Sequence, residues 1–237
     1  MMKAKELAET CRRIAEQEKT CYIWGGCGMP VTERTIADKV AQYPLNRTQG
    51  YEAAAKALIG SHAWMFDCVC LIKSVLWGWT GDWSKYYGGA IYGSNGVPDV
   101  TADGMIARCR EVSPSFSALA QGEALWLPGH IGVYLGGGLA AECTPAFAGG
   151  VQITAVANLG EIPGYPSRAW QKHGKLPGVV YGAPEQRKNG QIIVDGRTHA
   201  VDLILKDGSN YVKLRDLAGI VGWSVSNRGA TAVIETK

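Results

Sequence analysis

Helical patterns of apolar residues dominate the first part of the chain. Between residues 3 and 18, Leu7, Cys11 and Ile14 recur at helical spacing, which predicts an amphipathic helix. Asp67 precedes another apolar periodic run, and its short carboxylate side chain is a good helix cap. Similar periodicity predicts further helices over residues 32–42, 49–58 and 68–77.

Short apolar runs bounded by glycines replace this pattern from residue 124 onward, and they predict β-strands. Helices followed by consecutive strands indicate an α+β domain in which helices pack on an antiparallel sheet. Residues 78–98 are rich in Gly, Trp and Tyr and predict a long surface loop. Its aromatic side chains either line a binding cleft or only pack the loop onto the domain. The predicted strands cover residues 124–127, 130–135, 139–143, 151–156 and 178–181.

A polar segment at residues 182–190 predicts a linker between two domains. We therefore expect a first domain at residues 1–181 and a small accessory domain at residues 191–237. The second domain is near the lower size limit for folding alone. Its ββαββ pattern consists of strands at 191–194 and 199–205, a helix at 211–221, and a hairpin of residues 223–226 and 230–235.

Composition limits the class of protein. Hydrophobic residues make up 46% of the 237 residues and charged residues 19%, which is typical of a soluble globular protein with a sizeable core. A net charge of +3 is too small to indicate nucleic-acid binding. The polar N-terminus lacks the apolar stretch of a signal peptide, and no apolar run is long enough to cross a bilayer. We expect synthesis in the cytoplasm, no membrane insertion, and export by a route supplied elsewhere.

The seven cysteines give no sign of a disulfide framework or of a metal site. Their number is odd and their spacing is irregular. No pair has the two-residue spacing of a zinc knuckle, and none is followed by a pair of histidines. We therefore expect no metal and no cofactor. Most of these cysteines, including Cys70, are expected to be small buried apolar residues.

Three residues form a candidate catalytic set. Cys68 falls in the first helical turn after Asp67, where the positive end of the helix dipole favours a thiolate, the nucleophilic form. His130 lies in an apolar strand next to glycines, and because a buried imidazole needs a partner it is the candidate base. Glu142 lies one strand further on, beyond the glycine turn at 136–138, where a carboxylate can orient the imidazole. The alternative is a glutamate that faces solvent.

Three motifs occur in order along the chain: YIWGG at residues 22–26, FDC at 66–68 and GHIGVYLG at 129–136. Together they resemble the NlpC-type peptidoglycan cysteine peptidases, over roughly residues 5–181. The resemblance implies a papain-like domain in which the cysteine caps a helix and the histidine lies on a five- or six-stranded antiparallel sheet. It also implies a substrate site at Tyr22, Trp24 and Asp67. The third catalytic position of the family, commonly a histidine, corresponds to Glu142.

Two departures from the family pattern bear on specificity. Val69 and Cys70 replace the usual Ser-Gly after the nucleophile, which puts the usual γ-D-glutamyl-diamino-acid specificity in doubt. A long insertion at residues 77–109 can reshape the cleft or narrow its selectivity. Glutamate at the third catalytic position also occurs in amidase-type relatives, which favours amidase action.

The C-terminal part carries a weaker resemblance. Its motifs VDG at residues 194–196, DGSNYVKLR at 207–215 and VGW at 221–223 look like the copper-amine-oxidase N-terminal-like domain. That resemblance implies attachment to the cell wall or self-association, for example a homodimer through this domain. No metal ligands are evident in it.

The sequence leads to three functional hypotheses. The first is a peptidoglycan hydrolase of the phage endolysin type, released by a holin, that acts as an endopeptidase through a Cys-His-Glu thioester mechanism. The second is an N-acetylmuramoyl-L-alanine amidase with the same mechanism. The third belongs to another class, a non-catalytic protein that only binds the wall. Bacterial peptidoglycan is the expected partner in all three, and a bacterial enzyme or a transferase with the same residues remains open.

Overall fold

The computed structural model of the chain describes residues 1–182, 186–206, 209–228 and 231–236. It divides into two compact units, Met1–Tyr181 and Gly182–Lys237. Helix accounts for about 28% and strand for about 33%, so the predicted mixed helix-and-sheet class is confirmed. Among the described residues, no helix has the length and apolar character needed to span a membrane.

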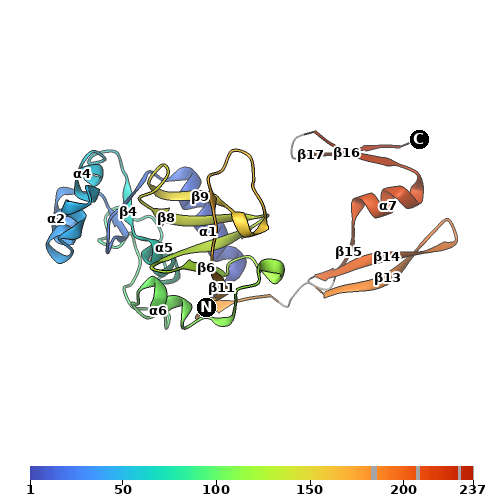
Figure 1. The fold of residues 1–237 in the computed structure, drawn as a ribbon, viewed down its shortest axis with the longest axis horizontal. Helices are drawn as coiled ribbons and strands as arrows, with labels where there is room; N and C mark the ends of the chain where they lie inside the picture. Colours follow the sequence, from blue (N-terminus) through green and yellow to red (C-terminus); the bar gives the residue numbers. More distant parts are fainter. Residues whose placement is uncertain (183–185, 207–208, 229–230, 237) are drawn as a thin grey trace. The chain divides into compact units, whose positions relative to one another are not determined.

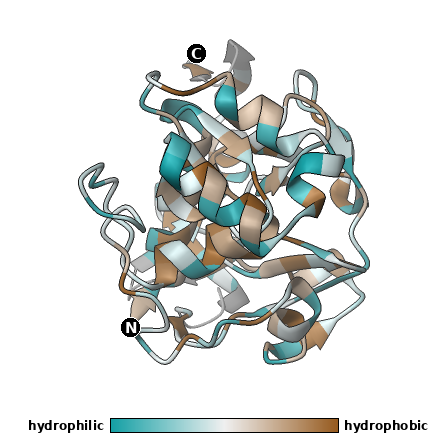
Figure 2. Ribbon diagram, turned by 90° about the vertical axis from the view of Figure 1, so that its left-hand side faces the viewer, coloured by the Kyte–Doolittle hydropathy of each residue, from teal (hydrophilic) through white to brown (hydrophobic). Residues whose placement is uncertain are grey.

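Helix α5 is the central helix of the first unit, because all nine of its residues are buried. Helix α1 buries Leu7, Cys11 and Ile14, the face predicted from their spacing. The helix predicted at 49–58 is shorter than expected and follows a separate short turn of helix. Polar and apolar residues occupy different sides of the outer helices (Figure 2). The helices of this unit are α1 (Ala4–Gln17), α2 (Glu33–Gln42), α3 (Leu45–Thr48), α4 (Tyr51–Lys56), α5 (Cys68–Leu76) and α6 (Ala102–Ile106) (Figure 1).

A curled seven-stranded sheet packs against α1 and α5 (Figure 1). Its strand order is β10-β9-β8-β7-β6-β11-β5, and all pairs are antiparallel except β10 with β9. It has more strands than the five or six that the resemblance implies. The strands are β5 (Arg110–Ser113), β6 (Ala124–Leu127), β7 (His130–Gly136), β8 (Leu139–Thr144), β9 (Gly150–Val156), β10 (Ser167–Arg168) and β11 (Lys172–Lys175).

Four of the predicted strands are confirmed as β6, β7, β8 and β9. Strands β5, β10 and β11 were not predicted, because they are short and polar and lack the alternation of apolar residues that marks a strand. The strand predicted at 178–181 is only β12 (Val179–Val180). It pairs in parallel with β1 (Met2–Lys3) and does not join the seven-stranded sheet.

A second, three-stranded sheet carries the residues that lead into the central helix. Its order is β2-β4-β3, with β2 at Thr20–Tyr22, β3 at Cys27–Pro30 and β4 at Trp64–Phe66. The chain leaves β4 through Asp67 and enters α5 at once. This sheet therefore fixes where helix α5 begins.

The second unit contains one strand more than predicted, so its pattern is βββαββ rather than ββαββ. The predicted linker is also too long, since residues 186–190 belong to β13 and pair with β14 through backbone hydrogen bonds that polar side chains do not prevent. Residues 183–185 of the predicted linker lie outside the described residues. So do residues 207–208 of the motif at 207–215 and residue 230 of the strand predicted at 230–235. The elements are β13 (Gln186–Val194), β14 (Arg197–Lys206), β15 (Ser209–Val212), α7 (Leu214–Val221), β16 (Ser224–Arg228) and β17 (Thr231–Glu235).

A disulfide between Cys27 and Cys70 joins strand β3 to the central helix. The prediction that Cys70 is only a packing residue is therefore wrong. Forty-three positions separate the two cysteines, and no local spacing signals a pair that the tertiary fold brings together. The other five cysteines, all within the described residues, are free.

Removal of this disulfide should destabilise the first unit. Closing a loop of 43 residues lowers the entropy of the unfolded chain, so the double variant Cys27→Ala/Cys70→Ala should lose about 2–4 kcal/mol of unfolding free energy. Urea denaturation without reductant measures the change. Cys109→Ala, which removes a free and partly exposed thiol, is the control and should lose less than about 1 kcal/mol. Equal stability of the double variant and the native protein would contradict the prediction.

Candidate active site

Cys68 is the first residue of α5, as the sequence predicted. The Asp67 side chain caps the helix, because its Oδ1 accepts a hydrogen bond of 2.7 Å from the backbone N–H of Cys70. The Cys68 side chain is largely buried, and its Sγ lies 4.0 Å from the carbonyl oxygen of Gly129. Gly129 immediately precedes His130, so the fold brings the start of α5 against the start of β7.

The pKa of the Cys68 thiol is raised rather than lowered. Burial, and after it the charge of Asp67, raise this pKa to about 12. Backbone N–H groups of Ile131, Val69 and Cys68 act in the opposite direction, as expected at a helix start, but they do not outweigh burial. Burial therefore acts against the thiolate that the helix start favours, because this helix start is covered rather than exposed.

The imidazole of His130 is held on two sides. Its Nε2 donates a hydrogen bond of 2.7 Å to Oε2 of Glu142, and its ring stacks on Trp170 with centroids 5.5 Å apart and planes 10° apart. The bond at Nε2 leaves Nδ1 as the nitrogen that can exchange a proton with a thiol. No hydrogen bond joins the ring to Sγ of Cys68 among the contacts of the described residues, so the two groups are near but not yet paired.

Glu142 is completely buried, so the alternative of a solvent-facing glutamate does not hold. Besides His130, its carboxylate accepts hydrogen bonds from Oγ1 of Thr154 at 2.7 Å and from Nε of Arg168 at 2.8 Å. Burial alone would raise the pKa of Glu142, but the hydrogen bonds and charges of His130 and Arg168 hold it below its usual range. The group is therefore an anion at neutral pH and can fix the orientation of the imidazole.

Sequence reasoning missed Thr154, Arg168 and Trp170, which complete the surroundings of Glu142 and His130. Thr154 lies in a predicted strand, where it pairs with Ala140 of β8, and only the folded structure shows that its hydroxyl reaches Glu142 diagonally across the strands. Arg168 and Trp170 fall in and just after β10, a stretch with no periodic pattern. No signal in the sequence could have identified these two residues.

The three residues predicted for the substrate site have different surroundings. Tyr22 lies at the end of β2 and is mostly buried, in the same core cluster as Cys68, and burial together with the charge of Cys68 raises the pKa of its hydroxyl. Trp24 exposes 42% of its surface and is available to a ligand. The carboxylate of Asp67 is buried, and its second oxygen accepts a hydrogen bond of 2.8 Å from the backbone N–H of Gly25, so it joins the glycine loop to α5.

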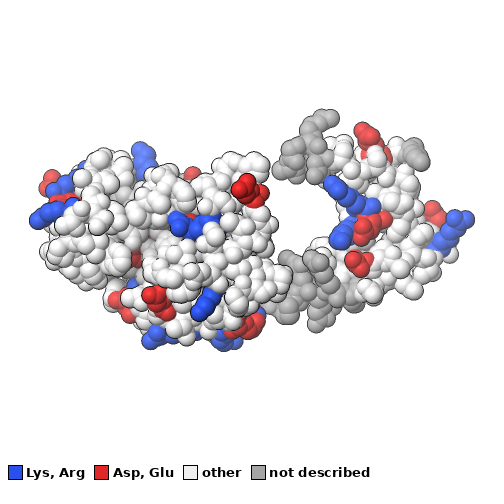
Figure 3. Space-filling model, in the orientation of Figure 1, with Lys and Arg blue, Asp and Glu red and all other residues white. Residues whose placement is uncertain are grey.

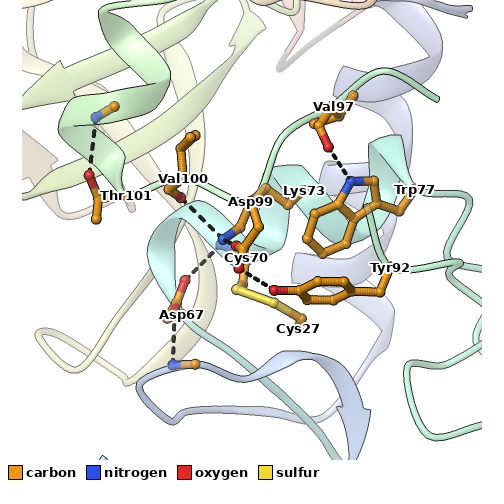
Figure 4. A network of polar contacts seen from close by, with 12 residues as sticks. Cys27, Asp67, Cys70, Lys73, Trp77, Tyr92, Val97, Asp99, Val100 and Thr101 are labelled. Atoms are coloured by element: carbon orange, nitrogen blue, oxygen red, sulfur yellow. Dashed lines mark hydrogen bonds and ion pairs between the residues drawn. A yellow bond between two sulfur atoms is a disulfide. The ribbon is translucent and has the colours of Figure 1, made fainter. Parts of the chain in front are cut away.

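The segment after α5 is tied to the back of that helix (Figure 4). Buried Lys73 pairs with Asp99 and donates a hydrogen bond of 3.1 Å to the carbonyl of Val100. The hydroxyl of Tyr92 also donates a hydrogen bond to Asp99. The indole N–H of Trp77 donates one of 2.8 Å to the backbone carbonyl of Val97. These contacts give residues 77–101 a fixed course beside the nucleophile helix.

The aromatic side chains of the predicted loop fall into two groups. Trp77 and Trp79 are buried and pack the loop down. Tyr86, Tyr87 and Ile91 instead contribute to the lining of a shallow hollow of about 460 Å³.

His173 is not an alternative base. Its ring is buried, with Nδ1 bonded to the carboxylate of Glu123 and Nε2 at 2.8 Å from the carbonyl oxygen of Ser115. Both nitrogens are therefore engaged in holding β11 in place.

In the described part of the chain, no three side chains of His, Cys, Asp or Glu are grouped as a metal site. Lys and Arg are interspersed with Asp and Glu on the face in Figure 3.

Neither the models of known protein families nor the curated protein sequences include a match to this chain.

Replacement of Arg168 should change the pH dependence of stability. Glu142 has a lowered pKa in the folded state, so its ionic contacts stabilise the fold above the unfolded pKa of about 4.3 and are lost as pH falls through the folded pKa. Arg168→Gln should therefore lower the unfolding free energy at pH 7, and the difference from the native protein should narrow in acid. Urea denaturation between pH 3 and 7 measures both.

Glu142→Gln provides the background for this test. In that variant Arg168 has no carboxylate to stabilise, so the effect of Arg168→Gln should no longer depend on pH. A difference between native and Arg168→Gln proteins that stays constant across the whole pH range would rule out the proposed role of the ion pair.

Proposed function

We propose that this protein is a cysteine hydrolase that cuts an amide bond in the peptide part of bacterial peptidoglycan. The observation that carries the proposal is the placement of Cys68 at the buried start of α5, against the turn that leads into His130, with Nε2 of His130 fixed by Glu142. A nucleophile, a base and a residue that orients the base are the parts required for acyl transfer through a thioester.

The architecture supports a papain-like arrangement. A central helix with the cysteine at its first position packs on one face of an antiparallel sheet, and the histidine begins a strand of that sheet. The motifs at residues 22–26, 66–68 and 129–136 support the NlpC-type family and with it the choice of peptidoglycan. The substrate class rests on that resemblance, whereas the reaction class rests on the site.

Formation of the reactive pair needs a small local change. A different rotamer of Cys68 re-aims Sγ without movement of α5 or β7, while the His130 ring stays held by Glu142 and Trp170. Catalytic hydrogen bonds are often long or misaligned without substrate and tighten when it binds. Once Nδ1 of His130 takes the thiol proton, the Glu142 anion stabilises the imidazolium that results.

The reaction then proceeds in two steps. Sγ of Cys68 attacks the scissile carbonyl carbon, and the C–N bond breaks as His130 returns the proton to the departing amine, which leaves a thioester on the protein. His130 next removes a proton from water, whose oxygen attacks the thioester carbon. The acid product leaves and the thiol is restored. Backbone N–H groups of Cys68 and Val69 at the start of α5 can stabilise the oxyanion of each step.

The remaining features suit action at the wall. The Cys27–Cys70 disulfide favours an environment outside the reducing cytoplasm, which release by a holin or another route would provide. Ile193, Tyr211 and Trp223 of the second unit are exposed and are available for attachment to the wall or for self-association.

A second candidate, wall binding without turnover, is favoured by one observation. The thiol of Cys68 has no hydrogen bond to His130 among the described contacts, and its pKa is raised rather than lowered. A protein of this kind would hold peptidoglycan in the same cleft and release nothing.

Digestion of purified peptidoglycan should release peptides with new termini, detectable by mass spectrometry. Cys68→Ala should reduce release to background, because no nucleophile remains. His130→Ala should slow release by about two orders of magnitude or more, since it removes the base. Glu142→Gln should slow it by about tenfold or more because the imidazole loses the anion that orients it.

Cys109→Ala is the matched cysteine control and should release fragments at the native rate, because Cys109 is free and distant in sequence from the motifs. Free stem peptides with an N-terminal alanine would identify an amidase, and cuts within the stem or bridge an endopeptidase. Binding to peptidoglycan without release would favour the second candidate. If the protein neither binds peptidoglycan nor releases peptides from it, peptidoglycan is refuted as the partner.

A further inference from the structure

The turn that leads into His130 is a two-residue hairpin. Leu127 pairs with His130 across β6 and β7, so Pro128 and Gly129 alone form the connection. Proline followed by glycine at a φ of +73° is the composition and conformation of a type II turn. Turns of this type do not match the twist of the strands they connect and tend to splay them. The position of His130 at the strand end therefore depends on contacts from outside the hairpin.

Asp103 supplies such contacts. It lies on α6, and its Oδ1 accepts a hydrogen bond of 2.9 Å from the backbone N–H of Gly129 and one of 2.8 Å from the indole of Trp126. Trp126 lies on β6, just before the turn, and Lys172 of β11 covers its ring. One carboxylate oxygen thus holds both the turn and the strand that enters it.

Helix α6 is itself a firm support. Ala102, Met105 and Ile106 are buried in the same core as α5. The residues just before α6 are bound to the nucleophile helix through Lys73, which contacts Asp99 and Val100 (Figure 4). The segment that reaches Asp103 is therefore anchored to the element that carries Cys68.

We propose, on the basis of the function proposed above, that Asp103 is a positioning residue for the catalytic pair. The Gly129 peptide that Asp103 holds by its N–H presents its carbonyl to Sγ of Cys68, and the next residue is His130. Asp103 acts through Gly129 and does not touch the reacting atoms. Through Asp103, the insertion at 77–109 thereby contributes to the position of His130 relative to Cys68.

Alkylation of Cys68 in the full-length protein tests this without a wall substrate. The part of the iodoacetamide rate at pH 7 that is lost in His130→Ala, followed by peptide-resolved mass spectrometry, reports how far His130 activates the thiol in the molecules in which the pair forms. Asp103→Ala should slow alkylation by about tenfold, since a small misplacement of a catalytic group is costly. His130→Ala gives the rate with no base. Trp126→Phe, which removes one of the two donors, should slow alkylation in the same direction but by less.

Two further variants separate positioning from stability. Asp103→Asn keeps an oxygen that can accept both hydrogen bonds, so its alkylation rate should stay within about twofold of the native rate. Thr101→Ala removes the cap of α6, the hydrogen bond of 3.1 Å from Gly104 N–H, without a contact to Gly129. It should also stay within about twofold.

A native or faster rate for Asp103→Ala, or a loss in Thr101→Ala equal to that in Asp103→Ala, would overturn the proposal. If Asp103→Ala does not fold, a native rate for Trp126→Phe would overturn it. Alkylation that follows the expected pattern, in a protein that releases nothing from peptidoglycan, would leave Asp103 as a positioning residue and refute only the proposed substrate.

Discussion

A carboxylate removed from water must have its charge balanced by nearby donors, and Glu142 imposes this requirement on the site. One oxygen takes the Thr154 hydroxyl, and Arg168 and His130 supply the positive or polar hydrogens that remain. The three donors lie on three different strands, β7, β9 and β10. The order of the strands in the sheet therefore brings these donors to the buried carboxylate and stabilises its charge. Orientation of His130 follows from the same contacts, since an imidazole bonded through Nε2 has little freedom to turn.

The surroundings of Cys68 have the opposite effect, because they favour the neutral form of its side chain. Cys68 is buried, and burial without a neighbouring cation favours its neutral form. A helix start is therefore not sufficient to produce a thiolate, because its dipole acts strongly only where the thiol is not also desolvated next to an anion such as Asp67. In the proposed reaction, His130 would be oriented in advance by Glu142, and Cys68 would become reactive only on pairing with His130.

Sequence alone predicts the parts of this site that depend on local chemistry. The cap at Asp67, the helix that follows and the apolar strand of His130 were all expected, because caps and periodicity act over a few residues. The disulfide and the contacts of Arg168 could not be predicted, since each joins segments tens of residues apart. Strand β11 was missed for a different reason. It is polar, and its buried His173 is stabilised by hydrogen bonds to Glu123 and Ser115, partners that lie more than 45 positions away in the sequence.

Cys68 and Cys70 are in different chemical states, although only one residue separates them. Cys70 is bonded to Cys27 inside the core, whereas Cys68 is free, and the proposed reaction requires it to stay reduced. That reaction would therefore be confined between two redox limits, one at which the Cys27–Cys70 bond is reduced and one at which the Cys68 thiol is oxidised. Because Cys70 is already committed, it cannot resolve a sulfenic acid formed at Cys68, and oxidative inactivation at Cys68 has no partner two positions away to reverse it.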